Sequence, residues 1–282
     1  EVKMKNEALQ IAKEADVIVC AMGETADMSG ECASRTNLEM PDVQQELLAE
    51  LAKMGKPVVL LNFAGRPTVL SWEKEHIPAI MNVWFGGSEM GDALCDVIFG
   101  DKVPSGKLTT TMPKTTGQEP LYYSHQNTGR PVPDDNQKFA KFASNCMDVS
   151  NGPLYPFGYG LSYTTFEYGD LKLSSHEVNM DDWKITATIN VKNTGSRDAD
   201  EVVQLYIRDM VASISRPVKE LKGFQRIHLA AGESREISFD ITPEMLKFYN
   251  AELKHVIEPG DFQIMVGGNS KEVKTQNLTV KN

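Results

Sequence analysis

The chain has 282 residues, of which 41% are hydrophobic and 24% charged, so it has the composition of an ordinary globular protein and is long enough for two domains. Its formal net charge of -10 argues against nucleic acid or an anionic membrane surface as a partner. No apolar run approaches the roughly 18 residues that a membrane-spanning helix needs, which argues against a membrane span.

The first part of the chain alternates between helical and strand patterns. Residues 58–61 form a continuous apolar run, as in a strand buried on both faces of a parallel sheet. The predicted elements are, in chain order, a helix over 1–15, a strand over 16–21, a helix from Pro41 to Gly55, a strand over 58–61, a helical or turn segment over 68–75, a strand over 79–84 and a helix from Gly86 through Ile98. Such alternation predicts an open α/β sandwich for residues 1–127.

A long stretch between the first predicted strand and the following helix has neither helical nor strand periodicity. Ordered loops of that length in compact domains are usually functional, and loops that follow the strands of α/β sheets are where ligands bind. This loop holds Glu24, Asp27, Glu31 and Arg35. It is therefore a candidate catalytic segment, and the alternative is an acidic loop that simply faces water.

The second part of the chain has a different pattern. Residues 128–160, with Pro131, Pro133 and the polar run 134–137, indicate a long connecting excursion. From about residue 161 apolar and polar residues alternate with a period of two, as in the run 185–192. Turn signals separate several such runs, so the sequence predicts an antiparallel β-sandwich over 161–282.

Neither cysteines nor glycines point to a metal or cofactor site. Cys20, Cys32, Cys95 and Cys146 show neither C-x-x-C spacing nor pairing with histidines, which argues against zinc. Cys20 and Cys95 stand in apolar runs, so we expect buried thiols there. Cys32 is either a nucleophile or a small loop residue. The glycine-rich turn 86–91 lacks the motifs of phosphate-binding loops, so we expect no cofactor.

Motifs along the whole chain occur together and in the same order in one known family. In the candidate loop they are Gly23-Glu24, Asp27-Met28-Ser29-Gly30-Glu31, Arg35 and Leu38-x-Met40-Pro41-x-x-Gln44. Downstream they are Asn62-x-x-Gly65-Arg66-Pro67, Trp84-Phe85-x-Gly87-x-Glu89-x-Gly91, Phe99-Gly100-Asp101, Pro104-Ser105-Gly106-Lys107-Leu108, Asn127-Thr128-Gly129-Arg130-Pro131 and Tyr155-Pro156-Phe157-Gly158-Tyr159-Gly160-Leu161-Ser162-Tyr163. This series resembles the family three glycoside hydrolases, in particular periplasmic β-glucosidases.

The resemblance implies that Glu31 is the general acid/base of a retaining, exo-acting β-glucosidase, which hydrolyses terminal non-reducing β-D-glucosyl residues. In retaining glycosidases a second carboxylate, about 5 to 5.5 Å away, attacks the anomeric carbon. The family takes that nucleophile, an aspartate, from a (β/α)8 barrel that precedes this region. The chain begins at Glu1 inside a predicted helix, without a methionine or signal peptide, so we expect a fragment that is inactive alone.

The same resemblance implies a fibronectin type III-like domain over 161–282 and a periplasmic or secreted protein. The implied partners are a β-glucoside or oligosaccharide substrate and the barrel of the same protein. A β-xyloside is the alternative substrate, and a noncatalytic surface or carbohydrate-binding protein is the alternative function. The aromatic side chains within 155–163 either stack on sugar rings or supply core at a domain junction.

The other polar residues of the candidate loop are expected to have structural roles. A guanidinium in contact with Glu31 would favour the ionised form and spoil a general acid, so we expect Arg35 to pair with Glu24 or Asp27. The dipeptide Ser29-Gly30 is expected to set the turn. A general acid must hold its proton near neutral pH, and the missing aspartate would be the neighbouring carboxylate that helps it do so.

Overall fold

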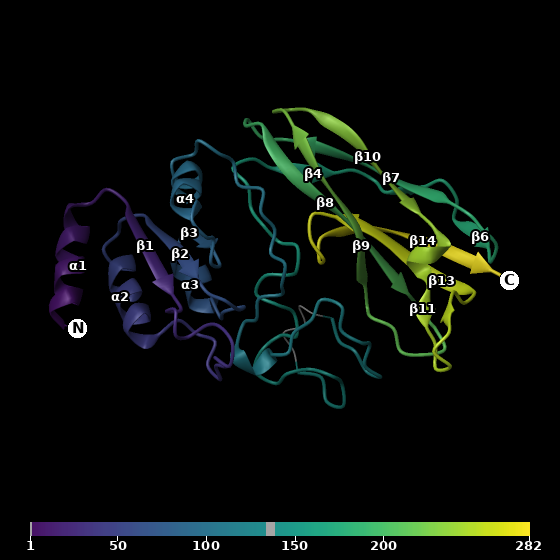
Figure 1. Ribbon diagram of the computed structural model, residues 1–282, viewed down its shortest axis with the longest axis horizontal. Helices are drawn as coiled ribbons and strands as arrows, with labels where there is room; N and C mark the ends of the chain where they lie inside the picture. Colours follow the sequence, from purple (N-terminus) through teal and green to yellow (C-terminus); the bar gives the residue numbers. More distant parts are fainter. Residues whose placement is uncertain (1, 134–138) are drawn as a thin grey trace. The chain divides into compact units, whose positions relative to one another are not determined.

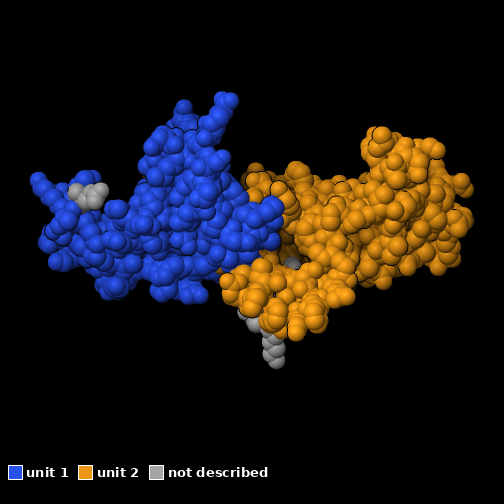
Figure 2. Space-filling model, turned by 90° about the horizontal axis from the view of Figure 1, so that it is seen from below, with its two compact units in different colours: residues 1–94, 112–121 blue, residues 95–111, 122–282 orange. Residues whose placement is uncertain are grey.

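A computed structural model describes residues 2–133 and 139–282 of the chain (Figure 1). Contacts divide the chain into two compact units, coloured separately in Figure 2. The first unit comprises residues 1–94 and 112–121, and the second comprises residues 95–111 and 122–282. The expected polar run 134–137 lies entirely outside the described residues. The boundaries expected at residues 127 and 160 stay predictions.

The first unit is built on a parallel β-sheet, as the alternating pattern predicts. Strands β1, β2 and β3 pair in that order, with Met22 opposite Asn62 and Asn62 opposite Asn82 near their carboxyl ends. The regular elements in this part of the chain are α1 (Val2–Glu14), β1 (Ile18–Gly23), α2 (Asp42–Ala52), β2 (Val58–Phe63), α3 (Ser71–His76), β3 (Ala79–Asn82), α4 (Met90–Ile98) and η1 (Thr116–Gln118). Because all three strands run in the same direction, the loops that follow them start at one edge of the sheet.

One face of this sheet carries the apolar core of the first unit. The register places Ile18 opposite Val58 and Cys20 opposite Leu60, and these side chains pack in one cluster with residues of α1 and α2. Leu60 and Leu61, adjacent in β2, are both buried, so the centre of this strand is covered on both faces as predicted. The core therefore fixes the sheet edge from which the candidate loop starts.

The two cysteine predictions have different outcomes. Cys20 is buried on β1, as expected. Cys95 is exposed, so the prediction of a buried thiol was wrong there. It lies on α4, a helix without a fully buried residue, and the apolar run around it is interrupted by Asp92 and Asp96. An apolar run on a helix covers its whole circumference, and only one face of such a helix packs against a neighbour.

The second unit contains the predicted β-sandwich. One sheet has the order β10-β7-β4, with β5 also paired to β7, and the other has the order β6-β14-β13-β8-β9. Inward-facing residues of both sheets, among them Ile189, Leu205 and Ile264, form one core. The elements are β4 (Phe166–Tyr168), β5 (Lys172–Leu173), β6 (Glu177–Asn179), β7 (Ile185–Asn193), β8 (Ala199–Asp209), β9 (Glu220–Leu229), β10 (Ser234–Ile241), α5 (Pro243–Leu246), β11 (Phe248–Tyr249), β12 (His255–Val256), β13 (Gly260–Gly267) and β14 (Val273–Lys281).

Aromatic residues ahead of the sandwich pack within the second unit. The ring of Tyr123 stacks on Phe157 with centroids 4.2 Å apart and meets Tyr206 of β8 edge-on at 5.9 Å. Tyr155 and Tyr159 stack on each other at 5.1 Å. Of the two interpretations offered for this cluster, these contacts favour core packing, because the ring faces that would hold a sugar are partly covered by other rings.

A buried ion pair fixes residues 95–111 to the sandwich. The Lys107 ammonium lies 3.0 Å from a carboxylate oxygen of Glu201, whose side chain is 5% exposed, and the Tyr168 hydroxyl donates to the same carboxylate at 2.8 Å. Backbone hydrogen bonds from Leu108 to Tyr159 and from Gly158 to Leu108 continue the contact. These bonds explain why this segment belongs to the second unit.

Candidate active site

The candidate loop leaves the sheet at Gly23 and is fastened there on two sides. The Gln44 side-chain amide of α2 accepts from the Gly23 amide at 2.7 Å and donates to the Gly23 carbonyl at 3.0 Å. The next amide, that of Glu24, donates to the Phe63 carbonyl of β2 at 2.7 Å. Gly23 has φ +133°, and a Cβ there would lie 1.9 Å from the Phe63 carbonyl oxygen, so only glycine fits.

A buried carboxylate sits at the base of the loop. Glu24 is 6% exposed, and its oxygens contact Arg35 Nη1 at 3.0 Å, Arg66 Nε at 2.8 Å and the Gly65 amide at 3.0 Å. Burial by itself would raise the pKa of Glu24, but the Gly65 amide and the two guanidinium groups outweigh it and lower the pKa below its ordinary value. Glu24 is therefore ionised in the folded protein at neutral pH.

Of the two partners predicted for Arg35, Glu24 is the one that the structure shows. The second terminal nitrogen of Arg35, Nη2, donates to the Glu39 carbonyl at 3.0 Å. Asp27 instead accepts a hydrogen bond from the Thr25 hydroxyl. Both loop carboxylates near Glu31 thus have partners of their own. The guanidinium of Arg35 is directed to the base of the loop, as the requirement of a general acid predicts.

Arg66 holds the tip of the loop, a role that we did not assign from the sequence. Its Nη2 donates to the Met28 carbonyl at 2.6 Å and to the Ala33 carbonyl at 2.7 Å, while its Nε faces Glu24. The motif Asn62-x-x-Gly65-Arg66-Pro67 drew attention to Arg66, but the carbonyls that Arg66 binds are 38 and 33 residues away in sequence, so the motif could not identify them.

The Ser29-Gly30 dipeptide shapes the turn, as predicted. Gly30 has φ +135°, and its carbonyl accepts from the Ala33 amide at 3.2 Å. Ser29 packs over Gly65, where an added Cβ would lie 1.8 Å from the Ser29 hydroxyl oxygen. The bare Gly65 backbone therefore lets the turn lie directly on the segment that follows β2.

Glu31 lies at the tip of this clamped turn and is exposed. Within residues 2–133 and 139–282, no hydrogen bond or ion pair engages its carboxylate. Cys32 beside it has φ +61° and an exposed thiol. No hydrogen bond joins that thiol to a histidine in the described part of the chain, so the arrangement favours a loop residue over an activated nucleophile.

Residues after β3 reach the same edge of the sheet. Phe85 is 52% exposed, and an atom of its ring would lie 3.2 Å from a Cβ placed on Gly65. Trp84 before it has φ +57°, a backbone conformation that is uncommon for a large side chain. The loops after β1, β2 and β3 thus converge around the turn that carries Glu31, which is where an open α/β sheet places its ligand site.

Among the residues that the structure describes, no three or more His, Cys, Asp or Glu side chains are grouped so as to hold a metal ion. None of the described helices has the length and apolar character to cross a membrane.

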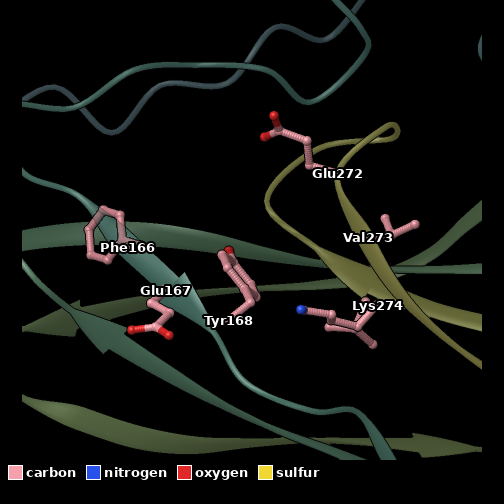
Figure 3. A pocket seen from close by; sticks show the side chains of 7 residues that line it. Phe166, Glu167, Tyr168, Glu272, Val273 and Lys274 are labelled. Atoms are coloured by element: carbon pink, nitrogen blue, oxygen red, sulfur yellow. The ribbon is translucent and has the colours of Figure 1, made fainter.

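A shallow hollow on the sandwich is a weaker candidate for a site. Figure 3 shows side chains of β4 and of the β13–β14 hairpin around it, and its lining consists of Phe166, Glu167, Tyr168, Val266, Glu272, Val273 and Lys274. The Tyr168 hydroxyl is already bonded to Glu201, and burial together with that carboxylate raises the pKa of Tyr168. The exposed aromatic residues Phe224 and Tyr249 lie on β9 and β11, away from this lining.

Comparison with known protein families decides the identity of the chain. Residues 2–163 match the glycosyl hydrolase family 3 C-terminal domain, and residues 201–270 match a fibronectin type III-like domain. The chain belongs to glycosyl hydrolase family 3. The resemblance found in the motifs is thereby confirmed, as is the fold class of an α/β domain followed by a fibronectin type III-like sandwich.

Relatives of this family 3 chain include proteins named β-glucosidase and proteins named β-xylosidase. The periplasmic β-glucosidase of Salmonella typhimurium is 49% identical over 271 residues, which cover 96% of this chain and 35% of that protein. A β-xylosidase of Formosa agariphila is 41% identical over 277 residues, covering 98% of this chain and 37% of that protein. The crystal structure of a β-glucosidase from Listeria innocua in complex with gluconolactone matches with a TM-score of 0.94 at 38% identity, covering 100% of this chain and 39% of that one. The chain thus spans little more than a third of each of these relatives.

Proposed function

We propose that this chain is the C-terminal part of a retaining, exo-acting β-glucosidase and that Glu31 is its general acid/base. In this proposal, an aspartate on a (β/α)8 barrel of the same protein attacks the anomeric carbon of a terminal β-D-glucosyl residue. Glu31 protonates the departing glycosidic oxygen and then deprotonates the water that releases the sugar. The protein is proposed to act in the periplasm or outside the cell, in line with the name of the relative from Salmonella typhimurium.

The observation that carries the proposal is an exposed carboxylate on a firmly held turn, without an ion pair in the described part of the chain. Arg35 and Arg66, the arginines nearest to the loop base, are both committed to Glu24. Among the described residues, neither of these arginines nor any other cation forms an ion pair with Glu31. A second carboxylate brought close from the barrel would favour the protonated form, which is the form that a general acid needs.

The two loop carboxylates that precede Glu31 both have partners within the chain. Glu24 is buried between two arginines, and Asp27 is bonded to Thr25. We therefore expect purified residues 1–282, folded as judged by circular dichroism, to hydrolyse no β-glucoside. Turnover by this piece comparable to that of the intact enzyme would contradict the division of labour between two carboxylates on different domains.

The test of the acid role is Glu31→Ala in the intact enzyme, assayed with glucosides that differ in leaving group. For methyl β-glucoside or a disaccharide, kcat/KM is expected to fall by about 1000-fold, since general acid catalysis contributes on the order of 100- to 10000-fold. For 2,4-dinitrophenyl β-glucoside, whose leaving group scarcely needs a proton, the loss is expected to be below about tenfold. The control is Glu39→Gln, an exposed carboxylate of the same loop. Equal losses for both substrates would exclude the acid role, and unchanged activity would favour a noncatalytic module.

A β-xyloside is the second candidate substrate because one relative, 41% identical, is named a β-xylosidase. The two candidates are separated by kcat/KM of the intact enzyme for 4-nitrophenyl β-glucoside and 4-nitrophenyl β-xyloside. We expect the glucoside to be preferred, in accordance with the 49% identical relative.

A further inference from the structure

We infer that Arg66 is a positioning residue that holds the Glu31 turn in its working orientation. This inference rests on the proposed acid/base role of Glu31. It assigns to Arg66 no contact with the substrate, only an action through Glu31.

The hydrogen bonds of Arg66 bracket the segment that carries Glu31. The Met28 and Ala33 carbonyls, at 2.6 and 2.7 Å from Nη2, stand at the two ends of residues 28–33. One guanidinium thus ties together the start and the end of the turn. The same planar group presents a second nitrogen, Nε, to Glu24, and the single ammonium of lysine has no such pair of separated donors.

Arg66 is itself held in place by its surroundings. It follows β2 directly, and its Nε pairs with Glu24, whose side chain is 1% exposed. The segment 62–68, which contains Arg66, is held by a hydrogen bond from the Asn62 side-chain amide to the Thr68 hydroxyl at 3.0 Å. The Arg66 side chain is 20% exposed, so most of its surface is packed. The turn is thereby tied to the rigid sheet and not merely to other loop residues.

The charge of Arg66 is compatible with this role. A cation close to an acid/base glutamate would stabilise its ionised form. Here the Arg66 guanidinium pairs with Glu24, and its bonds toward the turn go to backbone carbonyls and not to a side-chain carboxylate. Arg66 therefore positions the turn without acting as the counter-ion of Glu31.

Arg35 provides a matched control. It pairs with the same Glu24 carboxylate at 3.0 Å, and its side chain is 18% exposed, similar to Arg66. Its other bond goes to the Glu39 carbonyl, which lies beyond the turn. Loss of Arg35 disturbs the same buried charge but leaves the hydrogen bonds from Arg66 to the Met28 and Ala33 carbonyls in place.

The experiment compares Arg66→Met, Arg35→Met and Glu31→Ala in the intact enzyme with methyl and 2,4-dinitrophenyl β-glucosides. Displacing a catalytic group by about 1 Å costs on the order of 100-fold, so R66M is expected to lose about 100-fold with the methyl glucoside. With the dinitrophenyl glucoside the loss should be below about fivefold, because that step scarcely needs a proton. R35M should lower both rates by a similar factor. If R66M loses activity equally with both substrates while the loss in E31A still depends on the leaving group, the inference about Arg66 is overturned and the acid role of Glu31 stands.

A double mutant separates action through Glu31 from general damage. In the E31A background, R66M is expected to cost less than about threefold with the methyl glucoside, because the group that it positions is already gone. A further 100-fold loss there would overturn the inference. If R66M does not fold, Arg66→Lys keeps a positive charge but replaces two separate nitrogens, Nε facing Glu24 and Nη2 bonding the two carbonyls, by a single one, and it is held to the same comparison. Failure of Glu31 as the acid would be recognised separately, by a leaving-group-independent loss in E31A.

Discussion

Glu24→Gln removes the negative charge at the base of the loop that carries Glu31 and keeps the size of the side chain. In the folded protein this carboxylate contacts Arg35 at 3.0 Å, Arg66 at 2.8 Å and the Gly65 amide at 3.0 Å. A glutamine amide is neutral, so both guanidinium groups lose their anionic partner, and its one acceptor oxygen cannot serve the arginines and the Gly65 amide as the two carboxylate oxygens do. The loop is then held less firmly to the sheet.

The size of the effect follows from burial. Removing one partner of a buried ion pair costs about 3 to 5 kcal/mol because it leaves an uncompensated charge. The side chains of Arg35 and Arg66 are 18% and 20% exposed, so water compensates part of the loss and the lower end applies. At about 1.4 kcal/mol per factor of ten, a loss of about 3 kcal/mol makes opening of the loop about 100-fold more frequent.

Amide hydrogen exchange of the intact protein measures this opening directly. The reporters are the Glu24 amide, bonded to the Phe63 carbonyl, and the Ala33 amide, bonded to the Gly30 carbonyl. In Glu24→Gln both should exchange about 100-fold faster, while the amide of Leu60 in the middle of β2 should keep its protection. A change below about threefold at both reporters would refute the claim that the buried charge cluster holds the loop.

The control for this measurement is Glu7→Gln on α1. Glu7 pairs with Lys3 at 3.9 Å and its side chain is 61% exposed. Exposed ion pairs contribute little, so exchange in α1 should change by less than about threefold. The comparison separates the loss of a buried charge from the loss of any carboxylate.

Three further predictions follow from individual contacts. The pKa of Glu24 in the folded protein lies below its ordinary value of 4.5, so the contribution of this carboxylate to stability is complete above pH 4.5 and is lost as the pH falls below 4.5. Hydrogen-exchange protection of the loop should therefore fall below pH 4.5 in the wild-type protein and change little in Glu24→Gln. Gly23→Ala should destabilise the first unit by more than about 3 kcal/mol in urea denaturation, whereas Gly117→Ala, with no atom within 4 Å, should not. Lys107→Met leaves the Glu201 carboxylate unpaired and should lower the Tm of the second unit by roughly 10 °C in calorimetry, since a buried pair is lost; an unchanged Tm would show that the pair contributes nothing.

The position of the candidate loop in the fold was predictable because it depends on local pattern. The strand that ends at Gly23 and the aperiodic acidic stretch after it are both visible in the sequence, and a parallel sheet places such a loop at a ligand-binding edge. We also expected Arg35 to pair with Glu24 or Asp27, because a cation in contact with a general acid would favour its ionised form, and the structure shows that the partner is Glu24.

Other features depended on packing that no local pattern encodes. Cys95 was expected to be buried because its run is apolar, but the run winds around a helix and this side chain faces outward. Arg66 stands in a recognisable motif, yet nothing in that motif says which carbonyls it binds.

The sequence by itself determined the family, the order of the elements and the loop that carries Glu31, because periodicity and motif are local properties of the chain. Only the tertiary structure decided that Glu24 is buried between two arginines and that Arg66 ties Met28 to Ala33. The physical reason is that these bonds join the segments after β1 and β2, which the parallel pairing of the two strands brings side by side although some forty residues of chain separate them.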